Sequence, residues 1–559
     1  MKTYHPENRS AIYISALVAI SLVWGTHPVR AGGDAADEVS TTIRPEAIRA
    51  DMRFLADDLL EGRQTGTRGH EIAANFMAAE FEAMGLEPAG ENGTYFQNVP
   101  LRSTRPDEEH TTLSIVQGGK KQALIFRQDF LTYGDPGRTD TSVEAPVVYV
   151  GFGVTAPEQG YDDYAGVDVT GKVVASVYGA PPQFESTMRA HYSSRMTKAA
   201  NAVAHGAVGT ISLDSPVLEQ LYPFKERVND LAFPDMHWLD ARGQPNDYFP
   251  ELRATAILSM EATAGLFEGS GRSVEEVYTA AKEGKPLSLA LPVTAKIRLV
   301  SKLEDIRSPN VAARLQGSDP KLRDQYVVYT AHLDHLGIGE PVNGDKIYNG
   351  ALDNASGSAC LLEIARAYSQ MKPRPRRSIL FLSVTGEEEG LLGSDYFAHN
   401  PTVTNSSLVA DINMDGAALL WPIEDVIARG GEHSTLGAAV HQAAARLNID
   451  VSPDPHPEQV LFIRSDQYSF VRQGIPSVFP HSGVKSSNPK VKPDEIQMTW
   501  FKTIYHKPKD DMSQPFDFES GAKFARFNFL LGYLVAQQNE RPIWNPGDFF
   551  GEHYGNKKK

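Results

Sequence analysis

The sequence has a single cysteine in 559 residues, so no intrachain disulfide can form. A lone thiol also excludes a structural zinc site made of several cysteines. Cys360 lies in SACLLEIARAY, a helical pattern in which we expect it to pack in a core rather than to act as a nucleophile. Basic residues are in deficit too, since 54 lysines and arginines face 70 acidic residues, a net charge of −16. Such an acidic chain repels nucleic acid and anionic lipid, so neither is an expected partner.

Long apolar runs are nearly absent as well. The strongest, AIYISALVAISLVW at residues 11–24, follows a basic N-terminal stretch and precedes a small-residue site that ends at Ala31. A run of this length is too short to span a bilayer comfortably. It predicts a signal peptide over residues 1–31 and an exported protein, periplasmic or secreted. An N-terminal membrane anchor is the alternative interpretation.

What the chain does contain falls into three folded stretches. Helical patterns begin near Pro45 and, with the extended segments after them, make up an N-terminal part at 41–141. Short β-like runs with glycine-rich turns occupy 142–295 and predict an inserted, mainly β domain. Strands then alternate with amphipathic helices over 296–540, and a C-terminal tail follows at 541–559. The second N-terminal helix is expected to bury one stripe of residues, made of Ile72, Phe76, Ala79 and Ala83.

The alternating region predicts the fold class. Its strands, such as QYVVYTAH and SILFLSVTG, are short apolar runs separated by helices, which is typical of an α/β protein. We expect a mixed, largely parallel and twisted sheet sandwiched by helices. In such sheets, functional groups gather beyond the carboxyl ends of the strands.

Acidic and imidazole side chains stand at these strand ends and in two loops. The candidates are His332, Asp353, Glu387, Glu388, Asp415 and His506. Imidazole and carboxylate donors without a thiolate suit a zinc-like ion. Five such ligands exceed the needs of one catalytic ion and predict a pair of ions about 3.5–4 Å apart that share a carboxylate and a water. Glu387, the direct neighbour of a ligand, is expected to face that water as the general base.

Six segments carry a family resemblance: AHLDHLG, NGALDNASG, TGEEEGLLGS, INMDG, IRSDQYSFVRQGIPSV and YHKPKDD. In sequence, order and spacing they resemble the di-zinc aminopeptidases of metallopeptidase family M28. The resemblance implies the zinc aminopeptidase-like phosphorylase/hydrolase fold, two Zn²⁺ ions per chain, with manganese or cobalt as substitutes, and peptide substrates. It also implies hydrolysis of N-terminal peptide bonds, with Glu387 carrying a proton from water to the leaving amine.

Carried over by motif, the resemblance also assigns the ligands. His332 and Asp415 would hold one zinc, Glu388 and His506 would hold the other, and Asp353 would bridge them.

Four further residues receive supporting roles from the resemblance. Asp334 matches the carboxylate that orients the ligand His332. Tyr505 matches a tyrosine that stabilises the oxyanion in some members. Arg464 and Asp466 match a motif near the substrate pocket.

The region 142–295 resembles the protease-associated (PA) domain inserted in many members, where it acts as a lid or substrate-access module. Two positions depart from the family pattern. His335 lies close enough in sequence to His332 to compete as a ligand, and Gln467 stands where many relatives have histidine. The long segment 481–501 is expected to shape the rim of the pocket.

Three other functions share parts of this pattern. The same fold hosts carboxypeptidases and single-zinc glutaminyl cyclases, and receptor-like members bind without catalysis. Every expected ligand is present here, which argues against a binding protein. Metal stoichiometry would separate the cyclase, and peptides with a free amine or a free carboxylate would separate the two peptidases.

Overall fold

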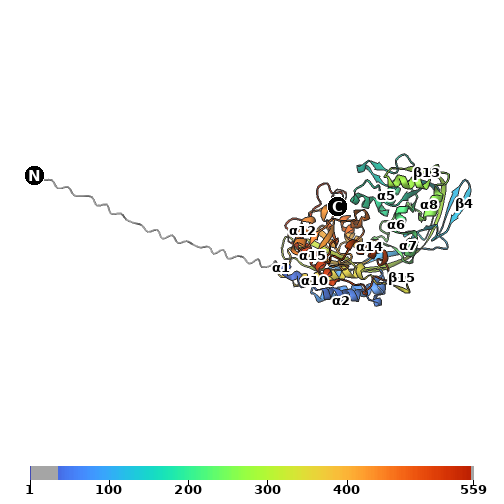
Figure 1. Cartoon of the computed structure of the whole chain (residues 1–559). Helices are drawn as coiled ribbons and strands as arrows, with labels where there is room; N and C mark the ends of the chain where they lie inside the picture. Colours follow the sequence, from blue (N-terminus) through green and yellow to red (C-terminus); the bar gives the residue numbers. More distant parts are fainter. Residues whose placement is uncertain (2–34, 556–559) are drawn as a thin grey trace. The chain divides into compact units, whose positions relative to one another are not determined.

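The computed structural model describes Met1 and residues 35–555, and Figure 1 draws this part of the chain in colour. The chain from Ala35 onward forms one compact unit. The predicted signal peptide and its cleavage site near Ala31 lie outside the described residues. Within the described part, no helix is both long and apolar enough to cross a bilayer.

Four parallel strands form the centre of the main sheet. They lie in the order β17 (Ser378–Val384), β14 (Tyr326–His332), β18 (Leu408–Asn413) and β21 (Ser477–Ser482). Every residue of the first three is buried, as expected for apolar strands covered on both faces. Antiparallel strands border them, with β13 (Ser288–Leu315) beside β17 and β19 (Asp425–Arg429) beside β21. The predicted fold class, a mixed and largely parallel sheet, is confirmed.

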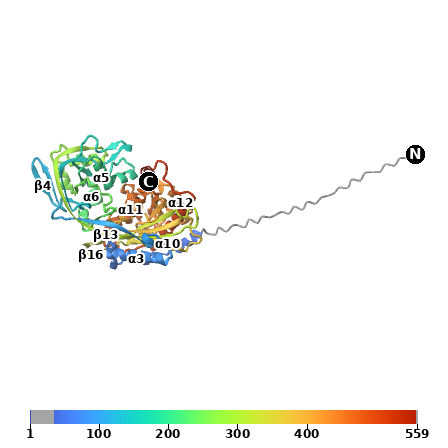
Figure 2. The ribbon, with the colours of Figure 1, turned by 180° about the vertical axis from the view of Figure 1, so that it is seen from behind.

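Helices cover both faces of this sheet (Figures 1 and 2). Val327 of β14 faces the larger core, to which α10 (Ser356–Gln370) contributes. Val328 points the other way, into a smaller core that includes Phe397 of α11 (Leu392–His399). Successive residues of a strand therefore enter different cores. The other helices of the larger core are α2 (Pro45–Leu55), α3 (Arg68–Ala83), α12 (Leu436–Arg446) and α15 (Phe518–Gln537).

The helix α3 buries a different stripe from the predicted one. Ala74, Met77 and Phe81 are buried, whereas Ile72 is 39% exposed and Ala79 is exposed. The predicted stripe is therefore wrong. Apolar residues surround most of this helix, so its spacing allows more than one stripe, and packing selects the face of Met77 and Phe81.

The inserted region shares its longest strand with the main sheet. The first half of β13 pairs with β3 (Thr112–Gln117) and β6 (Asp140–Val150), and a second hydrophobic core lies on this part of the sheet. The second half of β13 pairs with β2 (Phe96–Pro106) and β17. The inserted sheet thus begins at Thr112, and the predicted boundary at residue 142 falls inside β6. The likeness of this region to a PA domain stays a prediction.

Buried polar contacts also join the inserted region to the rest of the unit. The strand β11 (Asp235–Trp238) pairs with β2, and the Trp238 indole N–H donates to Oδ2 of Asp395 in α11 over 2.9 Å. The other oxygen of Asp395 accepts a hydrogen bond from Arg472 at 2.6 Å. The Asp395 carboxylate therefore joins α11 and Arg472 to the strand β11 of the inserted region.

The segment predicted as a C-terminal tail is packed as far as residue 555. It contains α16 (Phe549–Tyr554), in which Phe550 is buried. The Tyr554 hydroxyl lies 3.1 Å from the hydroxyl of Tyr468 and 3.2 Å from Nδ1 of His191 in the inserted region. This helix thus packs against both parts of the chain, so the described part of 541–559 is not a free tail.

Candidate active site

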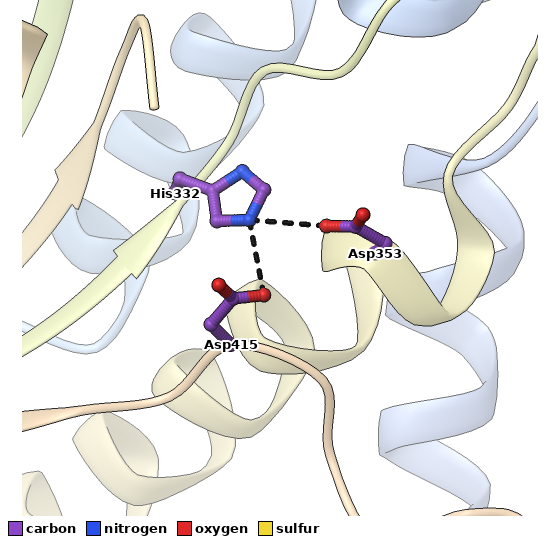
Figure 3. A group of neighbouring side chains, drawn as sticks. All are labelled: His332, Asp353 and Asp415. Atoms are coloured by element: carbon purple, nitrogen blue, oxygen red, sulfur yellow. Dashed lines mark hydrogen bonds and ion pairs between the residues drawn. The ribbon is translucent and has the colours of Figure 1, made fainter. Parts of the chain in front are cut away.

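Three acidic and imidazole side chains meet at the carboxyl edge of the central strands (Figure 3). His332 is the last residue of β14 and is fully buried. Its Nε2 lies 3.2 Å from Oδ1 of Asp353 and 3.2 Å from Oδ1 of Asp415. Asp415 follows β18, whereas Asp353 comes from the short helix η5 (Ala351–Ala355) that leads into α10.

The second oxygen of Asp353 points to a second group of side chains. Oδ2 lies 3.2 Å from Nε2 of His506, and the same nitrogen lies 3.1 Å from Oε2 of Glu388. Asp353 therefore stands between His332 and His506, with one oxygen toward each. The structure brings all five predicted ligands together around this carboxylate.

The pKa shifts show that the cluster favours positive charge. Burial alone would lower the pKa of His332, but the carboxylate of Asp415 raises it well above its usual value. Burial also opposes the charged form of His506, yet Glu388 raises its pKa to about 10. Burial would raise the pKa of Asp353, but the imidazoles of His332 and His506 beside its two oxygens hold that pKa well below its usual range. Cations placed between these carboxylates are stabilised, as divalent ions would be.

The donors also suit metal ions by type and direction. Nε2 of His506 is buried and faces the oxygens of Asp353 and Glu388 without forming a hydrogen bond. Ligand atoms of His332, Asp353 and Asp415 lie within 4.8 Å of one another. Imidazole nitrogen and carboxylate oxygen are ligands that zinc accepts. The residues present therefore fit the predicted pair of zinc ions, and their roles as ligands stay a prediction.

Glu387 and Glu388 lie on the turn after β17, and Asp334 holds this turn in place. The Asp334 carboxylate accepts hydrogen bonds from the backbone N–H groups of Glu387, at 3.3 Å, and Glu388, at 3.2 Å. Its Oδ1 is 3.9 Å from Nδ1 of His332, whereas the backbone carbonyl of Asp334 is nearer to that nitrogen, at 3.2 Å. In this geometry Asp334 positions the two glutamates more directly than it orients His332.

His335 lies in the cluster, although the family pattern gives it no ligand role. Its Nδ1 lies 2.6 Å from Oε1 of Glu388, and the ring is fully buried. Ligand atoms of His335, Asp353 and Glu388 lie within 4.8 Å of one another. Glu388 thus has one oxygen toward His335 and the other toward His506. Proximity to His332 in the sequence was the one signal for this placement.

Alanine variants of the two histidines should separate their roles. We expect His506→Ala to lose one zinc per chain and most activity, because His506 is the predicted imidazole ligand, whose Nε2 faces both Asp353 and Glu388. His335→Ala should keep both ions, since Glu388 retains the oxygen that faces His506. Zinc content after dialysis, measured by atomic spectroscopy, tests this. Equal zinc loss in the two variants would make His335 a ligand instead.

A buried serine, missed in the sequence, holds Asp415. Ser465 donates its hydroxyl hydrogen to Oδ2 of Asp415 over 2.7 Å, which leaves Oδ1 toward His332. The Ser465 oxygen in turn accepts from Nδ2 of Asn413 at 2.8 Å, and Asn413 also donates to Oε1 of Gln467. Gln467, which departs from the family pattern, thus belongs to the hydrogen-bond network behind this carboxylate.

Replacing Ser465 by alanine should weaken zinc binding by about tenfold, because partners of a ligand typically contribute 10- to 100-fold to metal affinity. Ser469→Ala is the matched control, since this serine is equally buried on the next turn and bonds Ser394 instead of a ligand. Competition with a chromophoric chelator measures both affinities. A zinc affinity of the Ser465 variant within twofold of wild type would exclude the role.

Asp510, also missed, supports the turn that carries Asp353. Its carboxylate accepts the backbone N–H groups of Leu352 at 2.8 Å and Asp353 at 3.0 Å. It is fully buried, whereas Asp511 is partly exposed. The motif YHKPKDD contains both aspartates, and the sequence does not show which one faces inward.

The remaining predicted site residues differ in exposure. Tyr505 is half-buried, its ring stacks on His506 at 3.8 Å, and burial raises the pKa of its hydroxyl well above the usual value. It therefore keeps its proton and can donate it in a hydrogen bond. Arg464 is exposed, whereas Asp466 is fully buried and burial raises its pKa to about 7. Direct contact between Asp466 and a substrate would need a rearrangement.

The predicted rim segment 481–501 is not an irregular loop throughout. It leads into α14 (Pro493–Thr503), in which Trp500 and Phe501 pack on Tyr505 with ring centroids 5.4 and 5.3 Å apart. Oδ1 of Asp494 lies 2.7 Å from Nε2 of His456. The segment thereby fixes the tyrosine next to His506.

This fold and this cluster define a candidate two-ion centre on an α/β sheet. Residues 310–529 match the family model described as Peptidase family M28. The matched segment contains every predicted ligand and belongs to peptidase family M28. The helices before residue 310 and nearly all of the inserted sheet lie outside the match.

Known proteins resemble the chain over different spans. It is 26% identical to the rat (Rattus norvegicus) aminopeptidase NAALADL1 over 405 residues. This match covers 64% of this chain and 48% of the rat protein. It is 36% identical over 105 residues to a probable zinc metalloprotease of Pyrenophora teres f. teres, covering 19% and 22% of the two chains. The chain thus spans about half the length, or less, of these curated relatives. The solved aminopeptidase from Aneurinibacillus sp. strain AM-1 shares the fold, with a TM-score of 0.53, 20% identity and coverage of 91% and 98%.

Proposed function

We propose that this protein is a zinc-dependent exopeptidase, an aminopeptidase that removes N-terminal residues from peptides. The observation that carries the proposal is the position of Asp353, whose two oxygens each lie 3.2 Å from Nε2 of a different histidine. A carboxylate placed in this way suits a bridge between two ions. His332 and Asp415 would hold one zinc, and Glu388 and His506 the other.

Glu387 is the residue that we propose to move the proton. Zinc bound in the centre would supply Lewis-acid chemistry, polarising the scissile carbonyl and acidifying a water. Burial raises the pKa of Glu387 well above its usual value. The charge of His332 lowers this pKa, whereas the nearby carboxylates of Asp415 and Glu388 raise it further. A carboxylate of raised pKa accepts a proton readily. Glu387 takes it from the attacking water and delivers it to the nitrogen of the leaving amine.

Tyr505 is suited to stabilise the oxygen of the carbonyl as it gains charge. Its hydroxyl stays protonated, and its ring is fixed between α14 and His506. A donor held in place in this way costs no reorganisation during the reaction. The exposed Arg464, whose charge acts on Tyr505, is in reach of the same region.

The charge of the site favours an amino terminus over a carboxyl terminus. Glu387 and Asp466 are carboxyl groups near the cluster that the proposed ligand set does not use, and the charge of two bound zinc ions would favour their ionised forms. Negative charge stabilises the ammonium of a free peptide amine and repels a free carboxylate. The name of one relative, the rat aminopeptidase NAALADL1, supports this choice.

A substrate panel combined with a zinc count tests the proposal. We expect two zinc ions per chain and release of the first residue from aminoacyl amides and dipeptides. N-acetylated versions of the same peptides should not be cleaved, because the free amine is lost. Cleavage of the acetylated peptides from their carboxyl end would favour a carboxypeptidase, and one zinc per chain with cyclisation of N-terminal glutamine would favour a glutaminyl cyclase.

We also propose that the chain is exported. The support is the apolar run at residues 11–24, with its basic flank and the small-residue site at Ala31. N-terminal sequencing of the protein recovered from outside the cytoplasm should begin just after Ala31. A chain that retains residues 11–24 in the membrane fraction would indicate an anchor.

A further inference from the structure

Arg63 lies beneath the candidate metal centre, although it precedes the matched family segment by more than two hundred residues. It ends the short helix η1 (Asp58–Arg63) and is only 1% exposed. Glu61, Gly62 and Arg63 all have positive φ, of 52°, 69° and 52°, which turns the Arg63 side chain inward. No side chain fits at Gly62, because a Cβ there would lie 2.4 Å from the carbonyl oxygen of Tyr348.

The guanidinium of Arg63 connects the two loops that carry His332 and Asp353. Nε donates to the carbonyl of Leu333 over 2.8 Å, directly after His332. Nη1 donates to the carbonyl of Asn349 at 2.7 Å, and Nη2 to that of Gly350 at 3.1 Å, at the start of the turn that carries Asp353. A further bond from Nη1 reaches the carbonyl of Leu55 in α2, and the N–H of His335 donates back to the Arg63 carbonyl at 3.4 Å. The five donors of an arginine form a rigid planar fork, so these bonds fix distances as well as directions.

Arg63 places a charge beside the ligands without occupying them. All four hydrogen bonds that its guanidinium makes within the described residues go to backbone carbonyl oxygens. Asp334, Asp353 and Glu388 lie close enough to stabilise its charge, and although burial lowers its pKa to about 10, it stays charged at neutral pH. A guanidinium paired with one of these carboxylates would instead take ligand oxygens away from an ion.

We propose that Arg63 is a positioning residue of the metal centre, which holds the loop of His332 and the turn of Asp353 at the separation that two zinc ions need. The inference rests on the proposed function, because it assumes that the cluster binds zinc. It makes the N-terminal segment 55–63 part of the active centre, although that segment supplies no ligand.

A lysine at position 63 separates positioning from charge. Arg63→Lys keeps the positive charge beside the carboxylates but loses the planar fork, so it cannot reach the carbonyls of both loops in the same geometry. We expect it to weaken zinc affinity by about 10- to 100-fold and to lower kcat by at least about tenfold, with KM within about twofold of wild type. A merely electrostatic role predicts no change in zinc affinity.

The matched control is Arg68→Lys. Arg68 lies five residues further on, and its guanidinium pairs with Glu61 at the surface, where the Arg68 side chain is 71% exposed. Zinc affinity is measured by chelator competition on wild type and both variants, and folding of the metal-free proteins by circular dichroism. The control should match wild type in every measurement.

Two outcomes overturn the proposal: a folded Arg63→Lys protein that binds zinc within twofold of wild type, or one that loses thermal stability alone.

If this variant does not fold, Asn349→Ala takes its place. Its side chain donates to the carbonyl of Ala56 and to Asp58, so the change loosens the same turn and leaves the guanidinium intact. Wild-type zinc affinity in that variant also contradicts the proposal. Failure of the proposed function is distinct, because the wild-type protein itself would then bind no zinc.

Discussion

Replacing Glu387 by glutamine is expected to lower kcat by about 100- to 10,000-fold and to leave zinc content unchanged. Proton transfer by a positioned side chain contributes about this much to catalysis. Glutamine keeps the size of the side chain but cannot accept the proton from water. The turn should stay in place, because Asp334 holds the backbone N–H groups of Glu387 and Glu388, which the substitution does not alter.

The measurement compares kcat and zinc content of Glu387→Gln with those of Glu389→Gln. Glu389 lies on the same turn and its carboxyl group accepts a hydrogen bond from Thr65 at 3.0 Å, so it controls for replacing a carboxyl group by an amide at this place. The control should keep activity within a few-fold of wild type. Retained activity in the Glu387 variant would refute its role, and loss of zinc from it would show that Glu387 is a ligand.

Replacing Asp353 by asparagine should remove at least one zinc per chain and lower activity by more than about 1000-fold. The asparagine side chain has one carbonyl oxygen and a donor NH₂ group, so it can face only one of the two histidines as an acceptor. The loss is larger than for Ser465 because Asp353 contacts both halves of the cluster, through Oδ1 to His332 and Oδ2 to His506.

Zinc content and activity are measured after dialysis at neutral pH, with Asp345→Asn as the control. Asp345 lies in the hairpin strand β16 (Asp345–Tyr348), is exposed, and should tolerate the change. Two zinc ions in the Asp353 variant would mean that this carboxylate does not bridge. The two-ion centre would then need another shared ligand.

The main sheet and the side chains at its edge could be predicted from the sequence for a physical reason. Parallel strands buried on both faces are continuous apolar runs, and their carboxyl ends meet at one edge. His332, Glu388 and Asp415 follow such runs directly. Asp353 and His506 lie in loops that no periodicity places; their residue types made them candidates, and the resemblance in the motifs NGALDNASG and YHKPKDD assigned their roles.

The parts that the sequence did not reveal depend on contacts between distant segments. Arg63, Ser465 and Asp510 are ordinary polar residues until the fold brings them to backbone groups or to a ligand. The stripe of α3 was predicted wrongly because apolar residues surround most of this helix, so helical spacing alone is compatible with more than one stripe. The bounds 142 and 295 of the inserted region stay a prediction, because strand pairing across β13 leaves no local pattern in the sequence.

The length of β13 has a mechanical consequence for substrate access. Its 28 residues run without a break from the ladder with β6 to the ladder with β2, so the inserted region is not joined to the rest by a hinge. Swinging one part against the other would have to bend this strand near Val300 and Ser301, where the ladder with β6 ends and the ladder with β2 begins. For the proposed peptidase, we therefore expect substrate to reach the centre through small movements of surface segments, without a swing of the inserted region. Deleting residues 112–300 would also remove the first half of β13 and leave unpaired strand edges, which promote aggregation.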